Sequence, residues 1–352
     1  MTELIPTFDF QRVFIEPWTL DWRVFLWVVL MGFFVAAACG LTGVYLILRR
    51  MALVGDAISH SVLPGLAIAF LAGSLAGGGA VAGGESHDLR NPTLMFIGAL
   101  AAGVVTTLLI ELIHKKSRVK QDAAIGITFS SLFAIGVILI SVFADKVDLD
   151  ADCVLYGEVG LVASHPFVEL GGIELAPWPV ARMALVFLAT GGLVLAFYKE
   201  LLVSSFDSGL AASLGIKPGL MHYALMCWLS VVVVSAFEAV GAILVIAMLI
   251  LPGATASLLT HRLPLIFLWT LVHAALSAVA GLHLAIWLDC PTAGAMVVAG
   301  AGLFCAAWVF SPSQGLLPGL RRRLSAAKVE APQFDDADGV SPGNPATPVA
   351  RR

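Results

Sequence analysis

The sequence has little charge. Only 12% of its 352 residues are Asp, Glu, Lys or Arg, against roughly a quarter in soluble domains. Three long stretches carry no charged residue at all, Val24 to Leu48, Thr93 to Ile110 and Ala123 to Ala144. Each is close to the roughly 20 apolar residues that a helix needs to cross a bilayer. We therefore expect an all-α, polytopic membrane protein.

Signatures of several other protein classes are missing as well. The five cysteines form no Cys-x-x-Cys pair, which argues against a disulfide framework or a thiolate metal site. No stripe of basic residues indicates a nucleic-acid partner. The absence of H-E-x-x-H and G-x-S-x-G motifs argues against an intramembrane protease or a related hydrolase. No G-x-x-x-x-G-K-[ST] loop occurs, so we expect no ATPase site within the chain. The N-terminus lacks the basic segment and cleavage site of a removable signal peptide.

The apolar runs predict about eight or nine transmembrane helices. The run from Gly219 to Thr260 is too long for one of them, because 42 residues would extend about 63 Å as a helix. That is about twice the hydrocarbon thickness of a bilayer. We expect this run to fold back near its middle, where Glu238 is its one charged residue. The predicted spans are roughly 24–48, 52–73, 93–114, 123–143, 178–198, 219–260, 264–288 and 291–310.

The Lys and Arg residues lie at the ends of these runs, and short loops rich in them are cytoplasmic as a rule. If the long run crosses twice, the chain makes nine crossings, with its N-terminus outside and its C-terminus inside. Eight crossings and a re-entrant segment remain an alternative. The loops expected in the cytoplasm contain Arg49 and Arg50, residues 114–120, Lys199, Arg262 and residues 321–323.

This topology divides the chain into three parts. Residues 1–23 form an extracytoplasmic segment, residues 24–312 a transmembrane domain, and residues 313–352 a cytoplasmic tail. The tail is rich in Ala, Pro, Asp, Gly and Ser, a composition that cannot bury enough apolar surface to fold. We expect the tail to be largely disordered.

Asp56 and His60 are polar residues inside a predicted span. Measured from Arg50 at the membrane edge, they lie about 9 and 15 Å deep, and their spacing places them on one helix face. An oxygen and an imidazole nitrogen on one face are half of a site for a first-row transition metal. Charges at such depth are costly and usually functional. A structural role, with Asp56 as a cap and His60 as a buried histidine, is the alternative. We expect His222, His273 and His283 to serve packing or helix ends.

The segment "LTGVYLILRRMALVGDAISHSVLPGLAIAFLAG" closely resembles the permease subunits of ABC-type importers for zinc, manganese and iron. The resemblance covers nearly all of residues 24–312 in the family's order. It implies a helical permease of the type II importer kind in the bacterial cytoplasmic (inner) membrane. Further matching segments are Asp122 to Ser141, Phe206 to Ile216, Phe237 to Leu263 and Gly281 to Val298.

The resemblance also implies partners and site residues. The partners are cytosolic ATP-binding subunits, an extracytoplasmic metal-binding protein and a second permease subunit, identical or different. The family's metal-binding positions fall on Asp56, His60 and Glu238, and the ion is cargo, with no permanently bound cofactor. The ATPase-coupling segment falls on Phe206 to Gly215, where Asp207 and Ser208 occupy the expected N-cap region. The named positions of this segment are Phe206, Asp207, Ser208, Leu210, Leu214 and Gly215.

Two functions remain after these considerations. The first is the permease subunit of an ATP-driven importer of manganese, zinc or iron, which is not itself an enzyme. We favour manganese because an acidic residue at position 238 adds an oxygen donor, which suits harder ions. The alternative is a secondary transporter in which Asp56 and Glu238 carry protons. The alternative gives the segment Phe206 to Gly215 no role.

Overall fold

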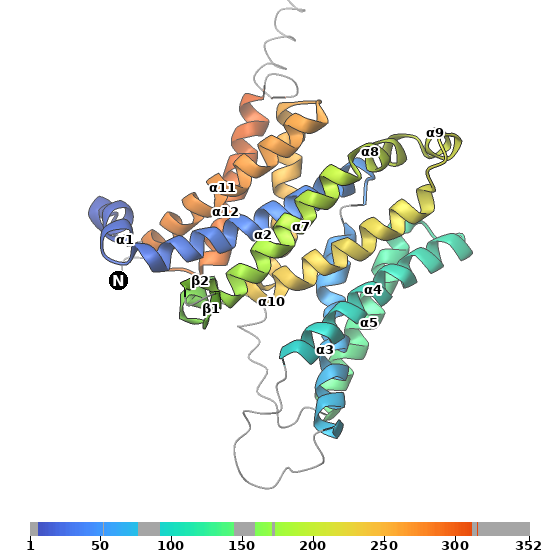
Figure 1. Ribbon diagram of the computed structural model, residues 1–352, viewed down its shortest axis with the longest axis horizontal. Coiled ribbons are helices and arrows are strands. Elements are labelled where there is room, and N and C mark those ends of the chain that lie inside the picture. Colours follow the sequence, from blue (N-terminus) through green and yellow to red (C-terminus); the bar gives the residue numbers. More distant parts are fainter. Residues whose placement is uncertain are drawn as a thin grey trace, which may run out of the picture.

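The computed structural model describes residues 6–51, 53–76, 92–143, 159–170, 173–311 and 315, without the side chains of residues 74–76, 92, 143, 170, 173, 238, 239, 242 and 243. The described part is a bundle of long helices (Figure 1). In chain order its elements are η1 (Gln11–Ile15, π-helical), α1 (Glu16–Thr19), α2 (Trp22–Leu48), α3 (Leu53–Ala76), α4 (Pro92–Lys116), α5 (Gln121–Phe143), η2 (Val159–Ser164, a 3-10 helix), β1 (Phe167–Leu170), β2 (Ile173–Pro177), α7 (Trp178–Ala196), α8 (Tyr198–Phe206), α9 (Ser208–Ser213), α10 (Pro218–Leu259), α11 (Leu263–Leu288) and α12 (Thr292–Phe310).

Eight helical segments of the described chain are long and apolar enough to cross a membrane, which confirms the predicted polytopic fold. A ninth apolar helix, Leu244–Leu259, is shorter. Its 16 residues extend about 24 Å. The eight long segments are Trp22–Leu48, Leu53–Gly73, Thr93–Lys116, Gln121–Val142, Trp178–Ala196, Pro218–Phe237, Leu263–Leu288 and Thr292–Phe310.

The long helix α10 consists of two arms that meet at Gly241. This glycine has a φ of 75° and a ψ of 170°, a conformation that only glycine adopts at little cost. The reversal is clear from α2, where the neighbouring residues Val44 and Tyr45 belong to clusters with Ala256 and Leu225 respectively. In one straight helix those two α10 residues would lie about 46 Å apart. The predicted fold-back is therefore present, three residues beyond Glu238.

The core of the bundle forms where α2 is enclosed by both arms of α10, by α7 and by α11. Small residues allow close helix contacts there, as is common in membrane proteins. A Cβ atom at Gly43 would overlap the carbonyl oxygen of Leu249. On the other side of the bundle, Gly65 of α3 and Gly98 of α4 bring two backbones into direct contact. Helix α3 also packs against α5.

Two features of the fold were not predicted: a short β-hairpin and the packing of the N-terminal turns against α11. Strands β1 and β2 form a small antiparallel hairpin, with Phe167 opposite Pro177, next to the start of α7 (Figure 1). The N-terminal turns pack on the far part of α11, where His283 donates a hydrogen bond to the carbonyl of Val13 and stacks on Phe14. His283 thus has the packing role that was expected.

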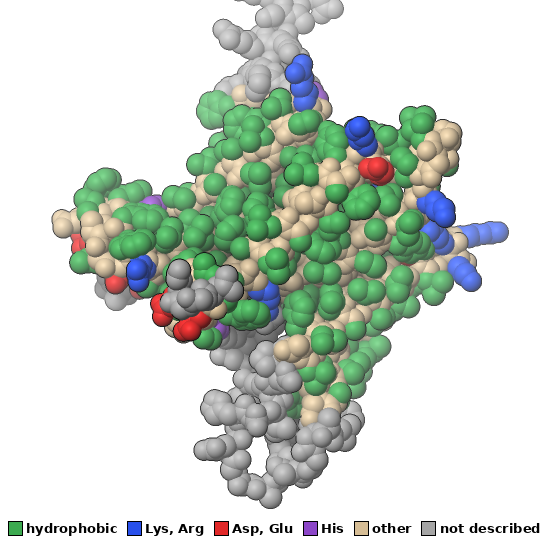
Figure 2. Space-filling view, viewed as in Figure 1, with side chains coloured by type: hydrophobic (Ala, Val, Ile, Leu, Met, Phe, Trp, Pro, Cys, Tyr) green, Lys and Arg blue, Asp and Glu red, His purple; other side chains and the backbone are tan. Residues whose placement is uncertain are grey.

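The basic segments gather at one end of the bundle. The ends of α2 and α4 and the starts of α5 and α10 meet there around one cavity. In Figure 2 blue side chains cluster at the edge where α4 and α5 meet, beside a largely green, apolar face. The start of α11 belongs to the same end, because Leu263 shares a cluster with Leu48 and Leu202. This gathering is what the predicted cytoplasmic placement of these loops requires.

Candidate functional site

Asp56 and His60 lie on one face of α3 and contact each other. The Nε2 atom of His60 is 3.4 Å from an oxygen of Asp56, and the two side chains are 34% and 40% exposed, respectively. Asp56 lies in the first turn of α3, and His60 follows one turn deeper. The expected shared face is thus present. A carboxylate oxygen and an imidazole nitrogen in contact, and still accessible, can together ligate a cation.

Two aromatic residues of α5 form a wall beside this pair. The ring of Phe129 lies 5.2 Å from that of His60, and the ring of Phe133 lies 6.1 Å away in an edge-on arrangement. Their spacing of four residues puts both on one face of α5. Neither residue was predicted from the sequence to belong to the site. The signal was present as a pair of phenylalanines in the second span after the Asp56 motif along the chain.

Glu238, the third predicted ligand, lies in α10 close to the break at Gly241. Its side chain is outside the described residues. Among the side chains that are described, no group of three His, Cys, Asp or Glu residues is placed to hold a metal ion. The three-residue ligand set therefore stays a prediction, of which Asp56 and His60 are in contact.

An arginine that contacts α10 near Glu238 was not considered in the sequence analysis. Arg182 lies in α7, inside a predicted span. Its guanidinium donates to the backbone carbonyl of Ser235 at 3.4 Å and lies over the ring of Phe96. An intramembrane cation is costly and therefore functionally suspect in its own right. The rule that marked Asp56 would also have marked Arg182.

The predicted coupling segment forms a capped helix at one end of the bundle (Figure 1). The Asp207 carboxylate accepts hydrogen bonds from the backbone amides of Gly209 and Leu210, at 2.9 and 3.0 Å. This confirms the expected N-cap, with Ser208 as the first residue of α9. Gly215 ends the helix with a φ of 82°, and the amide of Ile216 bonds back to the carbonyl of Ala211. The pattern is that of a Schellman motif.

This segment presents apolar side chains to its surroundings. Phe206, Leu210 and Leu214 recur every fourth residue and are 69%, 50% and 62% exposed. Ala211, the residue after Leu210, is fully buried. Exposed apolar residues that gather on one surface mark an interaction site. This surface can dock on a partner protein.

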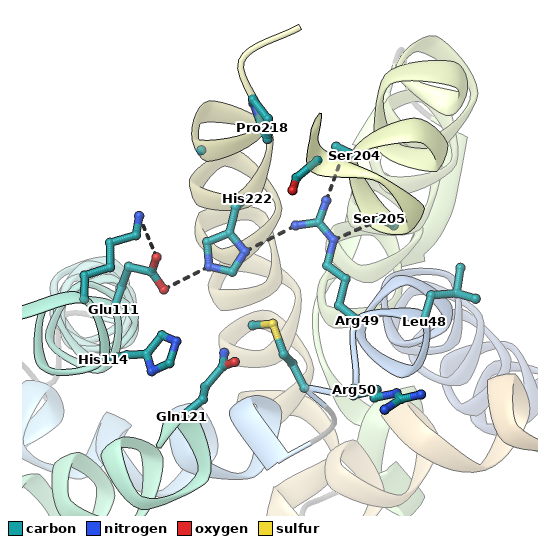
Figure 3. Close-up of a pocket in the computed structure, with 14 residues that line it drawn as sticks. Leu48, Arg49, Arg50, Glu111, His114, Gln121, Ser204, Ser205, Pro218 and His222 are labelled. Atoms are coloured by element: carbon teal, nitrogen blue, oxygen red, sulfur yellow. Dashed lines mark hydrogen bonds and ion pairs between the residues drawn. The ribbon is translucent and has the colours of Figure 1, made fainter. Parts of the chain in front are cut away.

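A polar network at the same end was missed by the sequence analysis. It borders a cavity of about 560 Å³, shown in Figure 3. Arg49 reaches Ser204 and Ser205 of α8 and His222 of α10. The cavity is lined by Leu48, Arg49, Arg50, Met51, Glu111, His114, Lys115, Gln121, Ser204, Ser205, Ser208, Pro218, Gly219 and His222.

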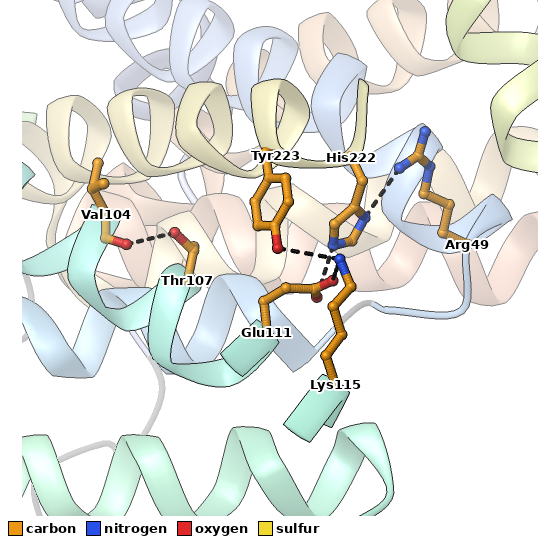
Figure 4. Close-up of polar contacts among 7 residues, drawn as sticks. All are labelled: Arg49, Val104, Thr107, Glu111, Lys115, His222 and Tyr223. Carbon is orange, nitrogen blue, oxygen red and sulfur yellow. Dashed lines mark hydrogen bonds and ion pairs between the residues drawn. The ribbon is translucent and has the colours of Figure 1, made fainter. Parts of the chain in front are cut away.

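The network continues from His222 into α4 (Figure 4). His222 Nε2 lies 3.1 Å from a carboxylate oxygen of Glu111, whose other oxygen pairs with Lys115 at 2.7 Å. Lys115 also donates to the hydroxyl of Tyr223. The role expected for His222, packing or a helix end, is therefore incomplete, because the ring joins two charged groups. His273, by contrast, is buried and contacts the carbonyl of Gly300, as a packing histidine would.

Comparisons with known proteins agree with this arrangement. Residues 21–311 match the ABC 3 transport family. The manganese transport system membrane protein MntD of Bacillus subtilis is 41% identical over 306 residues, which are 87% of this chain and 98% of the relative. The zinc transport system membrane protein TroD of Treponema pallidum is 39% identical over 294 residues, which are 82% of this chain and 75% of the relative.

Solved structures give the same answer. A chain of PsaBC from Streptococcus pneumoniae, in complex with Fab, is similar with a TM-score of 0.68 and 30% identity, over 89% of this chain and 100% of that chain. A metal-chelate type ABC transporter in an inward-facing conformation has a TM-score of 0.54 at 18% identity, over 80% of this chain and 84% of that chain, and supports the fold alone. The predicted fold class is thus confirmed, and the chain belongs to the ABC 3 transport family.

Proposed function

We propose that this chain is the membrane-spanning permease subunit of an ATP-driven importer of a divalent transition metal ion. The observation that carries the proposal is the contact between Asp56 and His60 inside a membrane helix. Polar groups at that depth are expensive and mark ion pathways. Relatives named for manganese and for zinc transport support the class of cargo.

Manganese is the favoured ion, with zinc and iron as alternatives. Asp56 and His60 supply an oxygen and a nitrogen donor, and Glu238 would add a second carboxylate. Oxygen-rich sets suit manganese, whereas thiolates, which select softer ions, are missing from this set. A site with few ligands and no thiolate binds the ion weakly. Weak binding suits transport, since the ion must leave the site again.

The energy comes from a separate subunit in this account. The chain has no phosphate-binding loop of its own, so ATP is hydrolysed by cytosolic partners that dock on the coupling segment around α9 through Phe206, Leu210 and Leu214. An extracytoplasmic binding protein delivers the ion to a pair of permease subunits in the bacterial cytoplasmic membrane. Closure of the ATPases then opens the inner side, so that access alternates across the membrane.

The test separates this proposal from a secondary transporter. The chain, its partner ATPase and its binding protein are reconstituted in vesicles, and uptake of radiolabelled manganese is measured with zinc and iron as competitors. We expect uptake that requires ATP on the ATPase side and survives collapse of the proton gradient by an ionophore. Uptake that continues without ATP but stops with the ionophore would instead establish proton coupling, for which Asp56 and Glu238 are the candidate carriers.

A further inference from the structure

Arg49 connects three separate segments through its guanidinium. Its Nε donates to the hydroxyl of Ser205 and its Nη2 to that of Ser204, both at 3.0 Å, and its Nη1 donates to Nδ1 of His222 at 3.2 Å (Figure 3). Arginine has donors only, arranged in a rigid fork. The side chain is half-buried, and although burial lowers the pKa of the guanidinium, arginine stays charged at neutral pH.

The arginine also fixes the state of the histidine ring. Because Nδ1 of His222 accepts from Arg49, the ring proton lies on Nε2 and is donated to Glu111 at 3.1 Å. Glu111 in turn pairs with Lys115 (Figure 4). The two hydrogen bonds of the His222 ring are therefore donated in the same sense, from Arg49 to His222 of α10 and from His222 to Glu111 of α4.

One end of the network is attached to the coupling segment. Ser204 and Ser205 lie in the last turn of α8, and Asp207 is both the C-cap of α8 and the N-cap of α9. No loop separates the two helices. A displacement of α9 is thus transferred to the two serines that bond Arg49.

The other end of the network is attached to the helix that carries Asp56 and His60. Arg49 is the C-cap of α2, and the turn after it is tight, with the amide of Met51 bonded to the carbonyl of Leu46 at 2.8 Å. The amide of Val54 bonds to the carbonyl of Met51 at 3.2 Å. Helix α3 begins there and has Asp56 in its first turn. A displacement of Arg49 would therefore also displace the start of α3.

Apolar contacts alone would leave this joint free to slide. Tyr45 and Leu201 share a cluster between α2 and α8, and such contacts have no preferred direction. Beside them lies the cavity of about 560 Å³, which offers no close packing to hold the helices in register. The three directed hydrogen bonds of Arg49 supply that register.

We propose that Arg49 is a positioning residue that couples the ATPase-docking segment to the ion-binding face of α3. The proposal rests on the function proposed above. When the ATPases move α9, the Ser204–Ser205–Arg49 contact transmits the movement to Asp56 and His60, and the His222–Glu111 pair anchors the same guanidinium to the rest of the bundle. Without Arg49 the ATPases turn over, and the permease follows them incompletely.

The test compares two matched arginines in the reconstituted complex. Arg49→Ala removes the connection, whereas Arg50→Ala removes the same charge from the next residue, whose exposed side chain makes no hydrogen bond or ion pair in the described structure. The readouts are ATP hydrolysed, radiolabelled manganese transported and manganese bound at equilibrium. Ser204→Ala with Ser205→Ala gives a gentler break of the same contact if Arg49→Ala fails to fold.

We expect Arg49→Ala to lower the manganese transported per ATP by about fivefold or more, the lower end of common coupling effects, with manganese binding unchanged. The serine pair should lower the same ratio, and combining it with Arg49→Ala should add little. Arg49→Lys should rescue only in part, because an ammonium cannot form the fork. An unchanged ratio in both the arginine and the serine variants would overturn the proposal. Loss of ATP-dependent transport in the unmodified complex would instead reject the proposed function.

Discussion

Gly43 of α2 lies directly against the backbone carbonyl of Leu249 in the second arm of α10. No side chain separates the two helices there. The contact holds the returning arm of α10 against the centre of the bundle and depends on the missing Cβ atom of Gly43. The fold-back of α10 can therefore be tested by adding a single methyl group at position 43, with an alanine substitution.

Gly43→Ala should destabilise the protein by about 1–3 kcal/mol, the usual cost of overpacking, because the carbonyl of Leu249 has to move. The measurement is the thermal unfolding midpoint in detergent. Gly191→Ala is the control, since a Cβ atom at Gly191 in α7 would meet nothing within 4 Å. Alanine is the better helix former by up to about 1 kcal/mol, so the control should be neutral or slightly stabilised. Equal effects of the two substitutions would contradict the close contact.

The long-range organisation of the fold could be predicted from the sequence because it depends on segment length. A run of 42 residues cannot cross as one helix, so the reversal of α10 was expected. Its position was less accessible. Glu238 attracted notice as the charge in the run, while the turn is made by Gly241, one of several glycines whose backbone angles no local pattern reveals.

The candidate site could be predicted in part for a similar reason. Asp56 and His60 are four residues apart in one helix, so helical geometry alone brings them together. Arg49, Glu111 and His222 come from three segments of the chain, and only tertiary packing joins them. From the sequence, Arg49 was expected at the membrane edge and His222 in packing or at a helix end, and Glu111 was not singled out. The hairpin of β1 and β2 was not predicted either. Its two strands are short, and they do not stand out in a sequence that consists mainly of long apolar helical runs.

The cap of α9 provides the second prediction. Asp207→Ala removes the acceptor of two backbone hydrogen bonds, and loss of an N-cap costs about 1 kcal/mol. The amides of Gly209 and Leu210 should exchange with solvent deuterium roughly five times faster. Asp207→Asn keeps an acceptor oxygen and should leave exchange nearly unchanged. If both variants exchange alike, the cap does not hold the helix.

The exposed apolar surface of α9 provides the third prediction. Leu210→Asp together with Leu214→Asp should leave the thermal stability of the isolated chain within about 0.5 kcal/mol, as surface substitutions generally do. Co-purification of the ATPase subunit should be lost, because two charges would have to be desolvated on docking. Leu210→Met with Leu214→Met keeps the surface apolar and should retain the ATPase. Normal co-purification of the aspartate variant would show that the ATPase docks elsewhere.

Asp56 and His60 are proposed to hold the transported ion. The direct test is ATP-dependent uptake of radiolabelled manganese by the reconstituted complex carrying His60→Ala, at matched amounts of protein in the membrane. His261→Ala is the control, because His261 is exposed in the connection between α10 and α11. We expect uptake reduced at least about tenfold for His60→Ala, in line with the loss of a ligand worth about 1.4 kcal/mol or more, and normal uptake for His261→Ala. Normal uptake by the His60→Ala complex would show that His60 does not hold the ion and is instead a packing residue beside Phe129.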